Sequence, residues 1–204
     1  MKKIFLIVVM ALMTTIVVAQ SEEKKGIEVG VQMGLASLVN SPAISPIGGS
    51  PEIYTGIDYH LNIGYRHGAN SYAFVYGGIP LYTEYATHFE TTAQFEFSLK
   101  YRRFFRVEEW LEPFFGAGVG AVCAWSGFDY EDSRYENTWW NNIIALEIGV
   151  LIEVNRMSFF DISVGLFSGG QISHRNIVIP TGFQPTERVS VSGYRVALGY
   201  GFRF

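Results

Sequence analysis

The chain has 204 residues, of which 49% are hydrophobic, 16% aromatic and only 17% charged, and 22 are glycines. This composition excludes a disordered acidic or basic chain and predicts one ordered domain. Lys and Arg number 15 against 19 Asp and Glu, so no nucleic-acid partner is expected. A single cysteine, Cys123, excludes a disulfide framework and a cysteine-based metal cluster.

The first 19 residues have the features of a secretory signal. Lys2 and Lys3 precede an apolar stretch from Ile4 to Val18, and Ala19 ends a small-residue cleavage context. An uncleaved membrane anchor is the alternative, but the stretch is short of the ~20 residues that a spanning helix needs. We predict a signal peptide over residues 1–19 and a mature domain over residues 20–204. Loss of the two lysines lowers the basic count from 15 to 13 against 19 acidic residues, a net charge of −6.

From residue 26 onward the hydrophobic residues alternate with period two, as they do in β-strands. The segments are 26–38, 53–66, 72–85, 92–103, 113–125, 140–154, 159–172 and 193–204. Each is at least as long as the roughly 9–11 residues with which a tilted strand crosses a bilayer. In segment 72–85 the period is broken by Gly77, Gly78 and Pro80, which predicts a bulge or an edge-like distortion.

Segment 193–204 shows most clearly that the two faces of a strand differ in composition. One face carries Tyr194, Val196, Leu198, Tyr200, Phe202 and Phe204, and the other carries Gly193, Arg195, Ala197, Gly199, Gly201 and Arg203. Glycine weakens a water-exposed strand and packs against nothing, so a solvent face does not explain this pattern. Aromatic residues facing lipid, with glycine and arginine facing a narrow lumen, explain both faces.

The expected fold is therefore all-β, an eight-stranded antiparallel up-and-down transmembrane β-barrel in a bacterial outer membrane. The competing fold is a secreted lipocalin-like carrier, in which the apolar face would point inward. Glycine beside charge on the minor face favours the membrane barrel.

The connections alternate in length, as both termini on the periplasmic side require. Residues 67–71 and 155–157 are short turns, whereas residues 39–52, 126–139 and 173–187 are predicted outer loops. The connection 103–112 is long for a periplasmic turn. We expect aromatic girdles at both rims, formed by Phe104, Phe105 and Trp110 at one and by Tyr82, Tyr85, Trp139 and Trp140 at the other.

With these features the chain resembles the OmpA/OmpX-like family of eight-stranded outer-membrane barrels over essentially the whole mature sequence. The final strand, YRVALGYGFRF, is similar to the C-terminal signature of clients of the barrel assembly machinery. The resemblance implies that this machinery recognises Tyr200, Phe202 and Phe204, and that outer-membrane lipids surround the barrel. It implies no activity.

Charged side chains on the predicted inner face form two tiers. The tier near the periplasmic mouth holds Glu28, Arg66, Lys100, Arg102, Glu153, Asp161 and Arg203, and the higher tier holds Asp58, His60, Glu96, Glu147 and Arg195. Eight strands leave a lumen only wide enough for side chains, so opposite charges should pair there. A filled, rigid barrel is the favoured interpretation, and a narrow porin-like channel for ions or small solutes is the alternative.

The loop after segment 113–125 is acidic and aromatic. Asp129, Glu131, Asp132 and Glu136 surround Arg134, which could suit a divalent cation or a basic partner, although the spacing matches no calcium loop. Trp139 and Trp140 keep a recognition role open. We therefore expect a monomer with a structural or surface-interaction role, exerted on an extracellular ligand or protein through its loops.

An enzymatic role is not expected. A lipid-modifying outer-membrane enzyme would need a serine, a histidine and a carboxylate at the outer rim. His88 with Glu90, and Ser173 with His174, form no recognisable motif. The sequence also lacks a phosphate loop, a dinucleotide fingerprint and zinc-ligand spacing, so we expect no catalytic residue, cofactor or metal.

Overall fold

The computed structural model describes residues 24–39, 53–85, 88–130, 133–172 and 189–204. Their regular structure consists of strands β1 (Lys25–Val39), β2 (Ile53–His67), β3 (Asn70–Tyr85), β4 (His88–Phe104), β5 (Leu111–Tyr130), β6 (Ser133–Glu153), β7 (Ser158–Ile172) and β8 (Val189–Arg203). Within the described ranges, no helix has the length and apolar character needed to cross a membrane.

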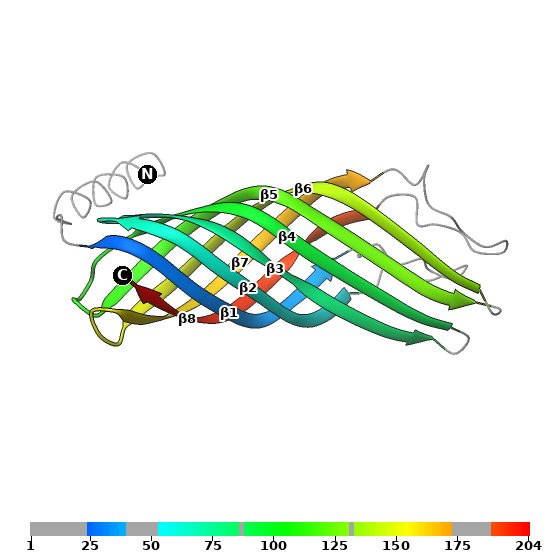
Figure 1. Ribbon diagram of the computed structural model, residues 1–204, viewed down its shortest axis with the longest axis horizontal. Helices are drawn as coiled ribbons and strands as arrows, with labels where there is room; N and C mark the ends of the chain where they lie inside the picture. Colours follow the sequence, from blue (N-terminus) through cyan, green and yellow to red (C-terminus); the bar gives the residue numbers. More distant parts are fainter. Residues whose placement is uncertain (1–23, 40–52, 86–87, 131–132, 173–188) are drawn as a thin grey trace, which may run out of the picture.

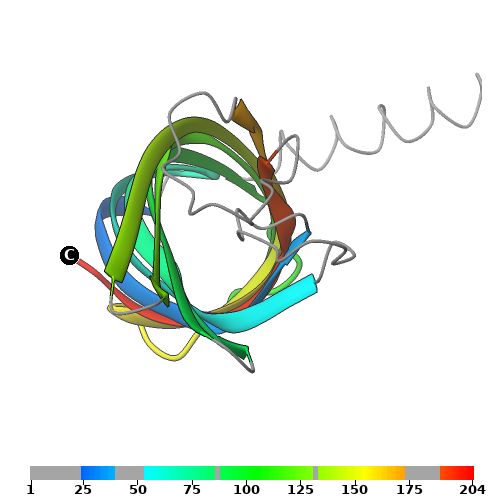
Figure 2. The ribbon, with the colours of Figure 1, turned by 90° about the vertical axis from the view of Figure 1, so that its right-hand side faces the viewer.

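The eight strands form one closed barrel in which each strand pairs antiparallel with its neighbours in sequence and β8 returns to β1 (Figures 1 and 2). Following paired residues from Glu28 once around the barrel leads to Leu38, ten residues further along β1. This stagger tilts the strands against the barrel axis. The predicted eight-stranded antiparallel up-and-down barrel is thus confirmed.

Alternate side chains of each strand lie in two different environments. On the outside, Leu99 is 65% exposed and Leu166 64% exposed, whereas Asp58 and Val122 on the inside are 1% and 0% exposed. The barrel is therefore apolar outside and contains most of its polar and charged side chains inside, the reverse of a water-soluble protein. An apolar surface of this extent requires lipid or a partner to cover it.

The two ends of the barrel differ in build. Lys24 and Phe204 lie at one end, which we call the mouth, together with the short connections 68–69, 105–110 and 154–157 (Figure 1). Gly68 makes the tight turn between β2 and β3 with φ of 59°, in the left-handed region that favours glycine. At the opposite end β5 and β6 extend furthest, since they have 20 and 21 residues against 15 to 17 in the other strands (Figure 1).

The bulge predicted in segment 72–85 is wrong. Strand β3 pairs with β4 without a register shift from Asn70 to Tyr85. Its pairing with β2 ends at Gly78 within the described residues, so the rest of β3 has one paired neighbour, which is the edge-like alternative. Pro80 lies in that part, where a missing backbone N–H is tolerated. The register shift lies instead between β7 and β8, near Ser168.

Candidate functional site in the barrel lumen

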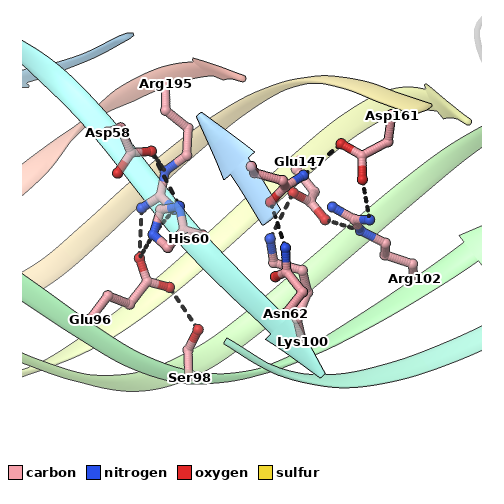
Figure 3. Close-up of polar contacts among 11 residues, drawn as sticks. Asp58, His60, Asn62, Glu96, Ser98, Lys100, Arg102, Glu147, Asp161 and Arg195 are labelled. Carbon is pink, nitrogen blue, oxygen red and sulfur yellow. Dashed lines mark hydrogen bonds and ion pairs between the residues drawn. The ribbon is translucent and has the colours of Figure 1, made fainter. Parts of the chain in front are cut away.

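The middle of the lumen contains a balanced cluster of two basic and two acidic side chains (Figure 3). Strand β4 supplies Lys100 and Arg102, strand β6 supplies Glu147 and strand β7 supplies Asp161. Glu147 accepts hydrogen bonds from Lys100 Nζ at 3.0 Å and from Arg102 Nε at 2.6 Å. Arg102 Nη1 donates to Asp161 Oδ2 at 3.2 Å. These pairs join three strands across the interior.

Further from the mouth, Arg195 of β8 is the centre of a second cluster (Figure 3). Its Nη2 donates to Glu96 Oε2 at 2.7 Å, and its Nη1 lies 3.0 Å from His60 Nε2. His60 Nδ1 lies 3.4 Å from Asp58 Oδ2. Both Asp58 carboxylate oxygens are buried without a hydrogen-bond partner. Asp58 therefore has as its ion-pair partner Arg195, whose Nε lies 3.7 Å from Asp58 Oδ2, with the His60 ring beside it.

A third cluster lies at the mouth. Arg203 donates to Glu28 and to Glu153, with N to O distances of 2.8 Å for both. Lys24 Nζ lies 2.7 Å from Glu153 and 3.1 Å from Glu112. The cluster is completed by the pair between Arg66 Nη2 and Glu112 Oε2, at 2.9 Å.

The twelve charged residues singled out in the sequence all lie in the lumen, but in three clusters and not in two tiers. Lys100, Arg102 and Asp161 were assigned to the mouth, yet they pair with Glu147, which was assigned higher. The ten-residue stagger of the barrel is the reason, because it raises or lowers each strand relative to its neighbours. Lys24 and Glu112 were missed, although Glu112 shares the inward parity of Gly116 on β5.

Two apolar clusters, also missed in the sequence, separate and cover the charged ones. One consists of Phe104, Phe114, Leu151 and Phe159, and the other of Ala36, Val122, Ile143 and Phe167. The prediction that Phe104 belongs to an outer girdle is wrong, since this residue is 1% exposed. It shares the inward parity of Arg102 and Lys100 on β4. Trp110, by contrast, is 54% exposed at the mouth.

Each arginine of the lumen lies over a phenylalanine ring. The guanidinium carbon is 3.7 Å from the ring centroid for Arg66 over Phe104 and 4.5 Å for Arg102 over Phe114. The other two pairs are Arg195 over Phe167, at 4.7 Å, and Arg203 over Phe159, at 5.6 Å. Such contacts contribute up to about 2 kcal/mol when they are desolvated. The apolar and charged clusters are thus one packed interior.

Glycines on the neighbouring strands make room for these rings. Phe114 is paired with Gly149, Phe159 with Gly201 and Phe167 with Gly193. A Cβ atom at any of these three glycines would collide with the ring opposite. The glycines that the sequence shows on the inner face are therefore the spaces into which the large lumen side chains fit.

The lumen leaves little free volume between its clusters. A cavity of about 30 Å³ lies between the mouth and the middle cluster and is lined by Asn62, Arg102 and Asp161 among others. It has room for about two water molecules. Asn62 Oδ1 and Arg102 Nη2, both buried without a hydrogen-bond partner, line the same cavity. In the described part of the chain no three His, Cys, Asp or Glu side chains could together hold a metal ion.

The predicted assembly residues and, of the predicted loop residues, Trp140 lie outside the lumen. Tyr200, Phe202 and Phe204 form a continuous aromatic row on the outer face of β8, with centroid distances of 5.1 Å and 6.3 Å. Trp140 is 63% exposed and stacks on Phe97 at 6.1 Å. Glu131 and Asp132 lie outside the described residues, as do the side chains of Asp129 and Trp139.

A closed eight-stranded barrel with an apolar exterior and a charged interior is the architecture of small outer-membrane β-barrels. The fold is similar to that of Neisserial surface protein A, with a TM-score of 0.64 and 15% identity over 89% of this chain and 100% of that chain. It is also similar to Ail, the attachment invasion locus protein of Yersinia pestis, in its complex with the heparin analogue sucrose octasulfate. There the TM-score is 0.50, with 12% identity over 88% of this chain and 99% of that chain. No family model and no curated protein matches the sequence.

Proposed function

We propose that this protein is a closed, monomeric barrel of the bacterial outer membrane that acts through its outer rim, after removal of residues 1–19. The observation that carries the proposal is the blocked lumen. Three ion-pair clusters and two apolar clusters succeed one another along the axis. Strand β4 alone contributes Phe104, Arg102, Lys100, Ser98 and Glu96 to them.

Opening this interior to solute would mean separating buried ion pairs. Removing one partner of such a pair costs about 3–5 kcal/mol. The lumen charges are therefore better suited to rigidify the barrel than to conduct. Because the interior is closed to solutes, we infer that the protein functions through the exposed ends of the barrel.

The long hairpin of β5 and β6 is the best candidate for an interaction surface. Its strands exceed by far the roughly 9–11 residues that cross a bilayer, so their ends project from the membrane. In the sequence, four acidic residues flank Arg134 between the end of β5 and the start of β6: Asp129, Glu131, Asp132 and Glu136. The Ail complex holds a sulfated ligand, but an acidic tip repels sulfate and favours a basic partner.

The interaction is tested by binding of a hexalysine peptide to the reconstituted barrel, with sucrose octasulfate as the ligand of opposite charge. We expect hexalysine to bind and the quadruple variant D129N/E131Q/D132N/E136Q to lose that binding. The matched control is E108Q/E109Q, two exposed acidic positions at the other end. Binding that survives the quadruple variant, or that is confined to sucrose octasulfate, would contradict the proposal.

A narrow channel is the second candidate, and the polar cavity lined by Asn62 and Arg102 is the observation in its favour. Planar-bilayer recordings separate the two candidates. A closed barrel gives no conductance above that of the protein-free bilayer. Discrete conductance steps with the wild type, absent from protein-free lipid and detergent controls, would establish the channel.

We also propose that the protein has no enzymatic activity. Of the pairs considered in the sequence, Ser173 and His174 lie outside the described residues, so the test is chemical. Mass spectrometry of lipid A and phospholipids from cells that express the protein should show no new species. A modified lipid A that depends on Ser173 would overturn this part of the proposal.

A further inference from the structure

A hollow of about 460 Å³ lies in the outer wall of the barrel, over the neighbouring strands β3, β4 and β5 (Figure 1). We call it the wall groove. This volume is in the range of small-molecule binding sites, roughly 300–1,000 Å³. The sides of the wall groove are two rows of paired residues, Tyr72, Tyr101 and Ala117 toward the mouth and Phe74, Leu99 and Val119 away from it.

The floor of the wall groove is backbone, because the row between the two sides faces the lumen. Lys100 in this row is 7% exposed, and its Nζ donates to Glu147 inside the barrel at 3.0 Å. Gly118, its paired neighbour on β5, has no side chain. Ala117 pairs with Tyr101 on one side and with Leu146 on the other, and its small side chain leaves the groove open between them. The groove therefore offers an apolar ligand a surface without charge.

The mouth end of the wall groove is polar, and one amide side chain orders it. Asn70 Oδ1 accepts hydrogen bonds from the Tyr101 hydroxyl at 2.7 Å and from Arg103 Nη1 at 2.8 Å. Arg103 follows Tyr101 by two residues on the same face of β4, which is about 7 Å along a strand. The Arg103 guanidinium is thus held next to the groove by a neutral partner.

The described residues do not neutralise the charge of Arg103. It forms no ion pair with any of them, and the one polar contact of its side chain is with Asn70. A guanidinium has five N–H donors, so several remain for a ligand. The paired row that contains Arg103 and Asn70 continues to the exposed His67 on β2 and Lys25 on β1, and it contains no carboxylate.

The wall formed by β7 and β8 is built differently. The Tyr200 ring contacts the rings of Phe160 and Phe202, with centroids 4.9 Å and 5.1 Å apart. Toward the mouth this face of β8 ends in Phe202 and Phe204, without a basic side chain. Such a wall suits any lipid chain, whereas a groove beside an arginine suits a lipid with a negatively charged headgroup.

We propose that the wall groove binds one anionic phospholipid, with an acyl chain against Phe74 and Leu99 and the headgroup phosphate at Arg103. Arginine donates two parallel N–H groups to a phosphate, a geometry that lysine lacks. Tyr72 and Tyr101, with ring centroids 5.4 Å apart, lie between the apolar groove and Arg103, as tyrosines do at the boundary between acyl chains and headgroups. The inference rests on the proposed membrane location and adds a lipid partner to it. A second copy of the chain is the alternative occupant, and the experiment separates the two.

The test is native mass spectrometry of the mature barrel in a non-ionic detergent, after titration with dioleoylphosphatidylglycerol. The comparison lipid is dioleoylglycerol, which has the same acyl chains and no phosphate. We expect one phosphatidylglycerol molecule to bind at least about tenfold more tightly than dioleoylglycerol, as a hydrogen bond to a charged group predicts.

Two variants remove the two halves of the site. Arg103→Gln removes the charge and Ala117→Leu fills the groove, and each should weaken phosphatidylglycerol binding by about tenfold. Dioleoylglycerol binding should fall in A117L and stay unchanged in R103Q. The matched controls are Arg156→Gln, an exposed basic residue in the 154–157 connection, and Ala121→Leu, four residues further along β5 and outside the groove. Each control should change binding by less than about twofold.

Heat-modifiable migration in gel electrophoresis verifies that all five proteins are folded. The lipid site is overturned if the two lipids bind equally well, or if a control weakens binding as much as the variant it matches. It is also overturned if the wild type forms dimers that A117L abolishes and the lipid does not displace. None of these outcomes affects the closed lumen or the outer rim. A folded wild type that stays soluble without detergent would instead overturn the membrane location and the lipid site together.

Discussion

The middle of the lumen and its mouth are built from the same residue types and differ in how completely side chains fill the space. In the middle, Lys100 and Arg102 face Glu147 and Asp161, and a confined space is filled by matched charges. At the mouth, ion pairs among Lys24, Arg66, Arg203, Glu112 and Glu153 line a cavity of about 620 Å³ that is left open. The comparison indicates that ion pairs fill the lumen where the barrel wall encloses them on all sides, whereas similar ion pairs at the end of the barrel leave a cavity.

The largest effect is expected when one carboxylate of the middle cluster is removed. Glu147→Gln keeps the size of the side chain but leaves Arg102 with Asp161 alone and Lys100 with no ion pair among the described residues. We expect the free energy of unfolding to fall by about 3–5 kcal/mol, the cost of breaking a buried pair. Urea titration of the barrel in lipid vesicles measures it.

The matched change at the mouth is Glu153→Gln. Its partners Lys24 and Arg203 each retain a second carboxylate, so the loss should stay below about 1 kcal/mol. Equal losses from E147Q and E153Q would show that position along the axis does not matter.

The spaces provided by glycine offer a second, smaller test. Gly201→Ala places a Cβ against the Phe159 ring and should cost about 1–3 kcal/mol, as overpacking does. Gly118→Ala is the control, because a Cβ atom added there makes only ordinary van der Waals contacts. It should change the free energy of unfolding by less than about 1 kcal/mol. If both variants unfold at the same urea concentration as the wild type, the pairing of rings with glycines is not a packing constraint.

Replacing an arginine by lysine separates stacking from charge. Arg195→Lys keeps a positive charge beside Glu96 but loses the planar contact with Phe167. We expect a loss of about 1–2 kcal/mol in the same urea titration. The exposed Arg106→Lys is the control, and a loss as large as that of R195K there would contradict a specific role for stacking.

The mildest perturbation is salt. Raising NaCl to about 1 M shortens the Debye length to about 3 Å, which screens exposed charges and leaves buried pairs almost unchanged. The free energy of unfolding of the wild type should therefore change by less than about 1 kcal/mol. A larger decrease in the urea titration would show that the ion pairs of the lumen are open to solvent.

The division between the two faces could be predicted from the sequence because it depends only on period two. Arg195, Ala197 and Gly199 lie inside, and Tyr194, Val196 and Leu198 outside, as the alternation indicates. Which side chains of one strand share a face depends only on that strand's own sequence. It can therefore be predicted without knowing which strands are neighbours.

The contacts across the lumen could not be predicted in the same way. Phe104 was assigned to a girdle for its aromatic character, yet it lies under Arg66 from another strand. Glu147 was placed above its partners because the stagger of the barrel cannot be read from a single strand. Such contacts require the register of all eight strands, which is fixed only when the barrel closes.

The ion pair between Arg203 and Glu28 joins residues 175 positions apart, from the last strand to the first. Loop-closure entropy makes such long-range contacts the slowest to form. The pair crosses the seam where β8 meets β1, so it forms only when the eighth strand has found its place. Before that moment the chain is an open sheet with two unpaired edges, which can still dissociate or pair with another chain. Closing the barrel wall and forming this ion pair at the mouth are thus one folding event.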